Sequence, residues 1–116
     1  MGSNFHELTE KLRLFAKARD WEQFHSPKNL ASALSVESGE LLEHFQWLTE
    51  ADSRRLGAQQ KEAVAMEAAD VFLYLLQLCD ALNIDLMRAA KEKLVLNEKK
   101  YPPERARGSN KKYTDL

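Results

Sequence analysis

The sequence is poor in residues that interrupt helices and in residues that cross-link chains. Its 116 residues include four Gly, three Pro and a single Cys. So few helix breakers, beside 44% hydrophobic and 30% charged residues, are typical of a helical protein. One cysteine excludes an internal disulfide framework and suits a reducing compartment. We therefore expect a cytoplasmic protein in which Cys79 is a small buried apolar residue.

The sequence also lacks a strong net charge and a long apolar run. A net charge of −1 does not favour a general nucleic-acid binder. The longest strongly apolar run, residues 71–76, is too short to span a bilayer. We therefore expect neither nucleic acid nor membrane as a partner, and a single domain over residues 1–116 with one modest core.

The spacing of apolar residues predicts an all-α fold with four helices. Ser26 and Pro27 suit the N-cap and first residue of the second helix. Pro102 and Pro103 should end the fourth helix, and the basic, polar residues 102–116 should form an extended tail. The predicted helices span residues 4–19, 27–48, 58–82 and 83 or 85–101.

The centre of the third predicted helix is apolar on nearly every side. Residues 71–78 contain one polar amide among aliphatic and aromatic side chains. Such a helix needs packing partners all round, and a chain this small can hardly supply them. This segment predicts an oligomer.

Two pairs of carboxylates stand three residues apart, Glu37 with Glu40 and Glu67 with Asp70. Residues three apart share one face of a helix, so two neighbouring helices would direct four carboxylates at one small volume. Like charges at that distance repel, and a cation among them removes the repulsion. An oxygen-only cluster suits Mg²⁺ or Mn²⁺ better than zinc, and such a metal indicates a phosphorylated ligand.

Two alternative interpretations of these acids remain open. Glu37, Glu67 and Asp70 fall on the apolar stripes of their helices, where a carboxylate is costly unless it is paired or metal-bound. The alternative is that they pair with Lys or Arg, or lie on solvated faces. A carboxylate-bridged di-iron site requires Glu-x-x-His on two helices, and only residues 22–25 match, so this class is disfavoured.

The sequence resembles the MazG-like all-α nucleoside triphosphate pyrophosphohydrolases, and specifically their dCTP pyrophosphatase branch. The resemblance is carried by Glu-x-x-Glu, an interval of 26 residues and Glu-x-x-Asp, together with the segments around them. Ser38 departs from the general motif, which often has a second Glu there, but the dCTP pyrophosphatase branch generally lacks that acid too. The similar segments are RDWEQFHSPKNL (19–30), ESGELLEHFQW (37–47), EAADVFLYLL (67–76) and KYPPERARGSNKKYTDL (100–116).

The resemblance implies Mg²⁺-dependent hydrolysis between the α- and β-phosphates of a deoxynucleoside triphosphate. The expected substrate is dCTP or a modified dCTP, the products are the monophosphate and pyrophosphate, and the role is control of the nucleotide pool. It implies that Glu37, Glu40, Glu67 and Asp70 hold the metal and form the catalytic centre, with Glu37 or Glu40 activating the attacking water. It also implies a four-helix unit that assembles as a homotetramer, a dimer of dimers, with sites at subunit contacts.

Substrate binding needs flat apolar surfaces and hydrogen bonds for the base, and basic groups for the triphosphate. The resemblance favours Trp21 and Trp47 as walls of a pyrimidine pocket, although aromatic residues at helix ends are commonly core. Lys and Arg near helix ends are commonly only solvated. The expected substrate-binding residues are Trp21, His25, Trp47, Tyr74, Lys93, Asn97, Lys100, Arg107, Lys111 and Lys112.

Two other functions stay open. One is a broad MazG-type hydrolase that accepts several deoxynucleoside triphosphates. The other is a non-enzymatic helical module that uses the apolar third helix for oligomerisation, which would leave the inward acids unexplained.

Overall fold

A computed structural model describes residues 2–115 of the protein, with side chains from residue 4 onward. Met1 and Leu116, at the ends of the expected domain and tail, lie outside the described residues. The chain divides into two compact units, Met1–Ile84 and Asp85–Leu116, and each is described by itself. Within residues 2–115 every regular element is helical and no strand is formed, which confirms the all-α class. The single domain stays a prediction.

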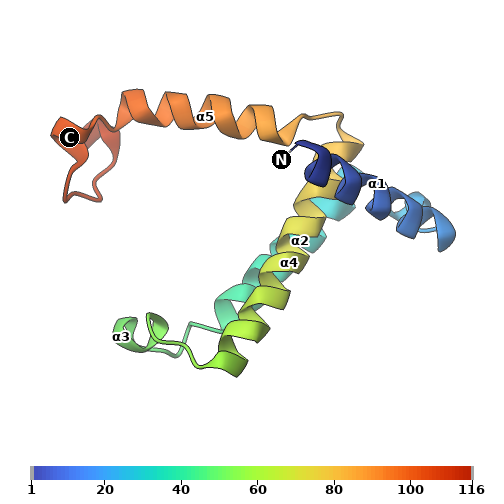
Figure 1. Ribbon diagram of the computed structural model, residues 1–116, viewed down its shortest axis with the longest axis horizontal. Helices are drawn as coiled ribbons and strands as arrows, with labels where there is room; N and C mark the ends of the chain where they lie inside the picture. The colour runs from blue at the N-terminus through green and yellow to red at the C-terminus, as the bar shows by residue number, and fades with distance from the viewer. Residues whose placement is uncertain (1, 116) are drawn as a thin grey trace. The chain divides into compact units, whose positions relative to one another are not determined.

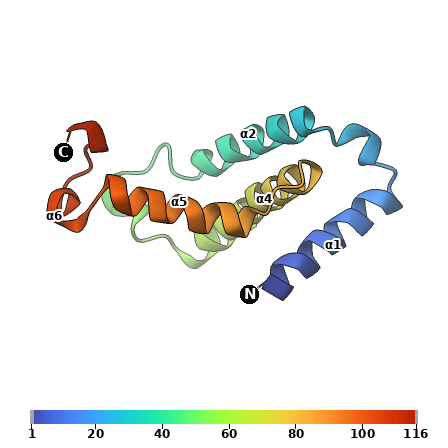
Figure 2. The ribbon, with the colours of Figure 1, turned by 90° about the horizontal axis from the view of Figure 1, so that it is seen from above.

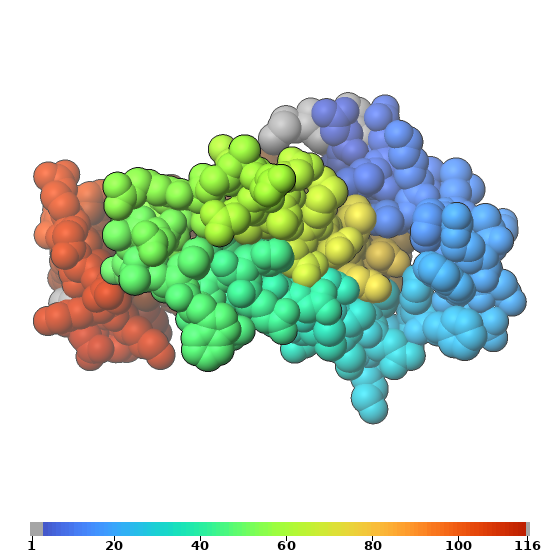
Figure 3. Space-filling model, turned by 90° about the horizontal axis from the view of Figure 1, so that it is seen from below, coloured from blue at the N-terminus to red at the C-terminus, as the bar shows by residue number. Residues whose placement is uncertain are grey.

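The first unit is built on a long helical pair. Its helix α2 packs along α4, and α1 lies against α4 (Figures 1 and 2). In the space-filling view the surfaces of α2 and α4 adjoin along their length (Figure 3). The elements of this unit are α1 (Gly2–Ala18), the 3-10 turn η1 (Glu22–Phe24), α2 (Pro27–Glu43), the short α3 (Glu50–Ser53) and α4 (Ala58–Ala81).

The start of α2 is set by local hydrogen bonding. The Ser26 hydroxyl accepts a hydrogen bond from the Asn29 amide at 3.2 Å, and Pro27 is the first helical residue. Proline suits this position because its missing N–H would have no partner in the first turn. The predicted start of the second helix is therefore confirmed.

Helices α1 and α4 end in the same way, with one residue in the left-handed conformation. Asp20 has φ 55° and Asn83 has φ 56°, a region that Asp and Asn tolerate better than most residues. The next amide folds back onto the helix, from Trp21 to the Ala16 carbonyl at 3.0 Å and from Ile84 to the Cys79 carbonyl at 2.8 Å. This is the Schellman arrangement, which satisfies carbonyls at the end of a helix.

Helix α2 ends at Glu43, whereas the sequence pattern predicts a helix to residue 48. The His44 amide bonds the Leu41 carbonyl at 3.3 Å and the Phe45 amide bonds the Leu42 carbonyl at 2.9 Å. These hydrogen bonds, each to a carbonyl three residues earlier, tighten the last turn and end the α-helix. The prediction was wrong here because the apolar spacing continues through a turn that is no longer α-helical.

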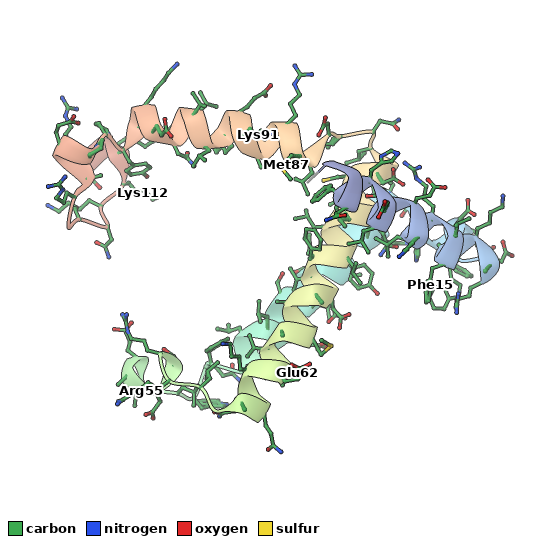
Figure 4. All side chains as sticks on the ribbon, viewed as in Figure 1. Phe15, Arg55, Glu62, Met87, Lys91 and Lys112 are labelled. Atoms are coloured by element: carbon green, nitrogen blue, oxygen red, sulfur yellow. The ribbon has the colours of Figure 1, made fainter. Side chains whose placement is uncertain are left out.

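The second unit contains α5 (Leu86–Lys100), α6 (Pro103–Ala106) and the 3-10 turn η2 (Tyr113–Asp115). Asp85 caps α5 by accepting a hydrogen bond from the Arg88 amide at 3.1 Å. The tail, which includes Lys112 (Figure 4), is not extended throughout, because α6 and η2 form within it. The Tyr113 ring meets the Tyr101 ring edge-on at 6.2 Å, so the tail folds back on the end of α5.

The buried core of the chain is small. Buried apolar side chains include Leu30 at 2% exposure, Leu76 at 3% and Cys79 at 7%. Burial also raises the pKa of the Cys79 thiol, as expected for a structural residue. Met66 on α4 stays 58% exposed, so this helix retains apolar surface that its own unit does not cover.

No helix in residues 2–115 has the length and apolar character required to cross a bilayer.

We predict that Leu30→Ala destabilises the protein by about 2–5 kcal/mol, the usual cost of removing a buried leucine side chain. Leu42→Ala is the matched control, because Leu42 lies on the same helix and is 59% exposed. Urea unfolding at a fixed protein concentration measures both. Equal effects of the two substitutions would contradict the position of the core.

Candidate functional site

Three carboxylates meet where α2 packs against α4. Glu37 comes from α2, and Glu67 and Asp70 come from α4. One oxygen from each lies within 4.8 Å of the others. Glu37 and Glu67 are half-buried, while Asp70 is exposed. The α2–α4 packing thus brings together members of the two acidic pairs that are 30 residues or more apart in the sequence.

Glu40, the fourth predicted acid, stands one turn beyond Glu37 and is exposed. It is outside the group of three closest oxygens, although its carboxyl influences the pKa of its neighbours. Desolvation, followed by the Glu37 and Glu40 carboxyls, raises the pKa of Glu67 from its ordinary 4.5 to about 8. In the absence of a cation, the cluster favours a protonated Glu67 near neutral pH.

Glu37 is under opposing influences. Hydrogen bonding with Glu67 lowers its pKa, whereas the Glu40 carboxyl, desolvation and the charge of Asp70 raise it, and the net pKa is above its ordinary range. Its Oε2 atom is buried and has no hydrogen-bond partner. A buried acceptor without a partner is costly, and a cation would satisfy it.

None of the ion pairs within the described part of the first unit involves these acids. Arg13, for example, pairs with Glu10 and Asp80 instead. The structure therefore gives no support in this unit to the alternative in which Lys or Arg neutralises the cluster. Three hard oxygen ligands at this spacing can hold a divalent cation of the Mg²⁺ or Mn²⁺ type.

A hollow of about 360 Å³ opens beside the acids, between α1, η1 and α4. Asp70 belongs both to the acidic cluster and to the lining of this hollow. The α4 residues in the lining are spaced three, one and three apart, which places them on one helical face. They are Asp70, Leu73, Tyr74 and Gln77.

An aromatic group lines the hollow opposite α4. The Phe15 and Trp21 rings meet edge-on at 5.7 Å, and Trp21 meets His25 at 6.3 Å. Figure 4 shows Phe15 on α1, and the Schellman turn after α1 places Trp21 on the path towards η1. The predicted residues Trp21, His25 and Tyr74 therefore share one apolar hollow, which has the size range of small-molecule sites.

Helix α1 is attached to α4 at two places eight residues apart on both helices. Phe5 and Phe72 meet edge-on at 5.7 Å, and Arg13 Nε donates a hydrogen bond to Asp80 Oδ2 at 2.9 Å. The same guanidinium lowers the pKa of Asp80 by hydrogen bonding. The two contacts hold α1 as a wall of the hollow.

Among the predicted substrate-binding residues of the first unit, the structure does not bring Trp47 to this hollow. Trp47 follows α2, is 88% exposed and is not part of the lining. Within the second unit, Asn97 is half-buried on α5, and the Lys100 ammonium lies 5.0 Å from the centre of the Tyr113 ring. The predicted residues of this unit are Lys93, Asn97, Lys100, Arg107, Lys111 and Lys112.

Sequence reasoning missed the α1 wall and two residues of α4. Leu8 and Leu12 have the spacing of an ordinary amphipathic helix, so nothing in the sequence separates pocket lining from core. Gln77 carried a usable signal, because it is the polar amide inside the apolar run 71–78. The missed lining residues are Leu8, Lys11, Leu12, Phe15, Leu73 and Gln77.

Comparison with known proteins gives consistent matches. The MazG-like family model matches residues 32–116. Rat and human proteins named dCTP pyrophosphatase 1 are 47% and 44% identical over 104 residues, 88% of this chain. The chain spans 61% of the length of these relatives. A crystal structure of a pyrophosphatase from Archaeoglobus fulgidus matches with a TM-score of 0.80 and 43% identity, covering 85% of this chain and 93% of that one. The chain belongs to the MazG-like family.

Proposed function

We propose that Glu37, Glu67 and Asp70 bind a divalent cation, Mg²⁺ or Mn²⁺. Three observations support this fit: the carboxylate oxygens within 4.8 Å, the partnerless buried oxygen of Glu37 and the raised pKa of Glu67. Each indicates that, within the described part of the first unit, no nearby positive charge balances the carboxylates of the cluster. Oxygen-only ligands favour these hard cations over zinc.

The proposed reaction is hydrolysis of a deoxynucleoside triphosphate, preferably dCTP or a modified dCTP, to the monophosphate and pyrophosphate. The observation that carries this proposal is the position of Asp70, which joins the acidic cluster to an aromatic-lined hollow. A nucleotide has the same two-part character, with an anionic tail and a flat base. The names of the rat and human relatives support the choice of dCTP.

In the proposed mechanism the base enters the hollow beside Trp21 and Tyr74, which leaves the phosphates at the acids. A divalent cation, when bound, neutralises phosphate charge and acidifies a coordinated water. Glu40, exposed and outside the closest group, orients the attacking water and accepts its proton. Glu37, half-buried and in contact with the other acids, is better suited to hold the cation than to exchange protons with solvent.

We further propose that the basic residues of the second unit contact the triphosphate. Lys93, Asn97 and Lys100 are spaced four and three apart on α5, so they share one face of that helix. Arg107, Lys111 and Lys112 lie in the tail beyond it. Their positive charges complement a substrate that carries several negative charges.

The protein is proposed to act as a homo-oligomer, a tetramer in the family pattern, in which Trp47 completes the base pocket of a second copy. Trp21 precedes and Trp47 follows the 17-residue helix α2 along the chain. A helix of that length is about 25 Å long, too far for both rings to contact one base in one chain. The high exposure of Trp47 and the uncovered apolar surface of α4 support this arrangement.

We predict that the purified protein with Mg²⁺ converts dCTP to dCMP and pyrophosphate. Asp70→Asn should lower kcat at least about a hundredfold, because the site loses one charged metal ligand. Glu62→Gln, an exposed acid on the same helix (Figure 4), is the matched control. Products are separated by anion-exchange chromatography. Release of dCDP and phosphate would refute the bond assignment, and equal kcat/KM for all deoxynucleotides would favour the broad-specificity alternative.

We predict that the cation-free protein loses stability as pH rises from about 5 to about 8. The native state holds a proton on Glu67 up to its raised pKa of about 8, whereas the unfolded chain releases it near 4.5. Stability therefore declines across this interval. Glu67→Gln should flatten the dependence, and Glu62→Gln should not. Melting temperatures in EDTA across this pH range measure the effect. If the melting temperature of Glu67→Gln depended on pH as steeply as that of the wild-type protein, the raised pKa of Glu67 would be contradicted.

We predict that Trp47→Ala raises KM for dCTP, and that mixing it with Asp70→Asn restores activity. If a site takes its acids from one chain and Trp47 from another, one of the two sites in each mixed dimer is intact, which is about a quarter of all sites in a one-to-one statistical mixture. Refolding the two variants together and assaying dCTP below KM measures this. A mixture of Glu67→Gln and Asp70→Asn is the control. It should stay inactive, because each site takes all its acids from a single chain and every chain in this mixture lacks one of them. Failure of the first mixture to recover would disprove the shared site.

A further inference from the structure

Gln77 lines the hollow described above and carries a side-chain acceptor that its own helix does not use. Its side-chain amide nitrogen donates a hydrogen bond to the Leu73 carbonyl at 3.2 Å. A carbonyl oxygen only accepts, so the NH₂ group must face the helix and the side-chain oxygen Oε1 is turned away from Leu73. Within the described residues no donor bonds to Oε1. The orientation of this amide is therefore fixed by α4 itself.

The surroundings of Gln77 increase the importance of this oxygen. Gln77 is partly buried and lines the 360 Å³ hollow together with Leu8, Leu12 and Leu73. It also lines the adjoining 490 Å³ hollow, on the side of Arg13 and Asp80. A base that fills the hollow and offers no donor would leave this oxygen unpaired, which costs more against apolar walls than in water, so a base with a matching donor is favoured.

The position of Gln77 on α4 suits the far edge of a base. Asp70, at the acidic cluster, is seven residues earlier on the same helical face, a rise of about 10 Å. This is comparable with the reach of a nucleotide from its α-phosphate to position 4 of a pyrimidine ring. Leu73 and Tyr74 lie between them and can contact the face of the ring.

We propose that Gln77 determines base specificity by accepting a hydrogen bond from the exocyclic amino group at position 4 of cytosine. Uracil and thymine carry a carbonyl oxygen there, which would face Oε1 as a second acceptor. Rotating the amide to present its NH₂ group would break the bond to Leu73. The inference rests on the proposed function, because it takes the hollow as the base pocket.

The experiment compares dCTP with dUTP, which differ at position 4, amino against oxo, and at the neighbouring N3, which carries a hydrogen only in uracil. Gln77→Leu should reduce the ratio of their kcat/KM values about tenfold or more, mainly by raising KM for dCTP. Gln77→Glu keeps an acceptor and should retain the preference for dCTP. Gln59→Leu, an exposed glutamine on the same helix, is the matched control. Gln77→Met, which keeps the side-chain length, replaces Gln77→Leu if the latter does not fold.

Binding of dCMP and dUMP, measured by calorimetry, separates this inference from the proposed reaction. If the wild-type protein prefers dCMP but cleaves neither triphosphate, the proposed hydrolysis is refuted. If Gln77→Leu then removes the preference for dCMP, recognition of the base by Gln77 is still supported. A folded Gln77→Leu variant that keeps the wild-type preference for cytosine, in cleavage or in binding, overturns the inference.

Discussion

The repulsion between carboxylates at the α2–α4 contact is the constraint on which the rest of the site depends. Glu37 and Glu67 are placed on faces that the helices turn towards each other, where desolvation, followed by the neighbouring carboxyls, raises the pKa of Glu67 to about 8. Apolar side chains at these positions would pack without such a conflict. The carboxylate cluster is unfavourable by itself and becomes favourable with a cation. The cluster therefore connects the stability of the α2–α4 contact to the proposed chemistry of the site.

Helix α4 organises both halves of the candidate site. Its stripe from Asp70 to Gln77 carries a carboxylate at one end and an amide acceptor at the other, with Leu73 and Tyr74 between them. The Arg13–Asp80 pair and the Phe5–Phe72 contact keep α1 beside this stripe. The hollow therefore has walls from two helices, and its position next to the acids is a consequence of helical periodicity.

Much of this arrangement could be predicted from sequence, because it depends on local rules. The cap at Ser26, the helical spacing and the two acidic pairs need only neighbours in the chain. The α1 wall could not be predicted, since tertiary packing decides it. The end of α2 at Glu43 was also missed, because the apolar spacing continues through the tighter turn that follows. The proposed role of Trp47 involves a second copy, which a single sequence does not describe. Gln77 was visible as a polar residue in an apolar run, but its meaning required the Leu73 hydrogen bond.

The most direct test of the central claim is the coupling of cation binding to proton release. Calorimetric titration with Mn²⁺ at pH 7, repeated in buffers of different ionisation enthalpy, measures both at once. The account predicts saturable binding with release of protons from the Glu37–Glu67–Asp70 cluster, and loss of that release in Glu67→Gln. Absence of binding, or the same proton release from Glu67→Gln as from the wild-type protein, would contradict it.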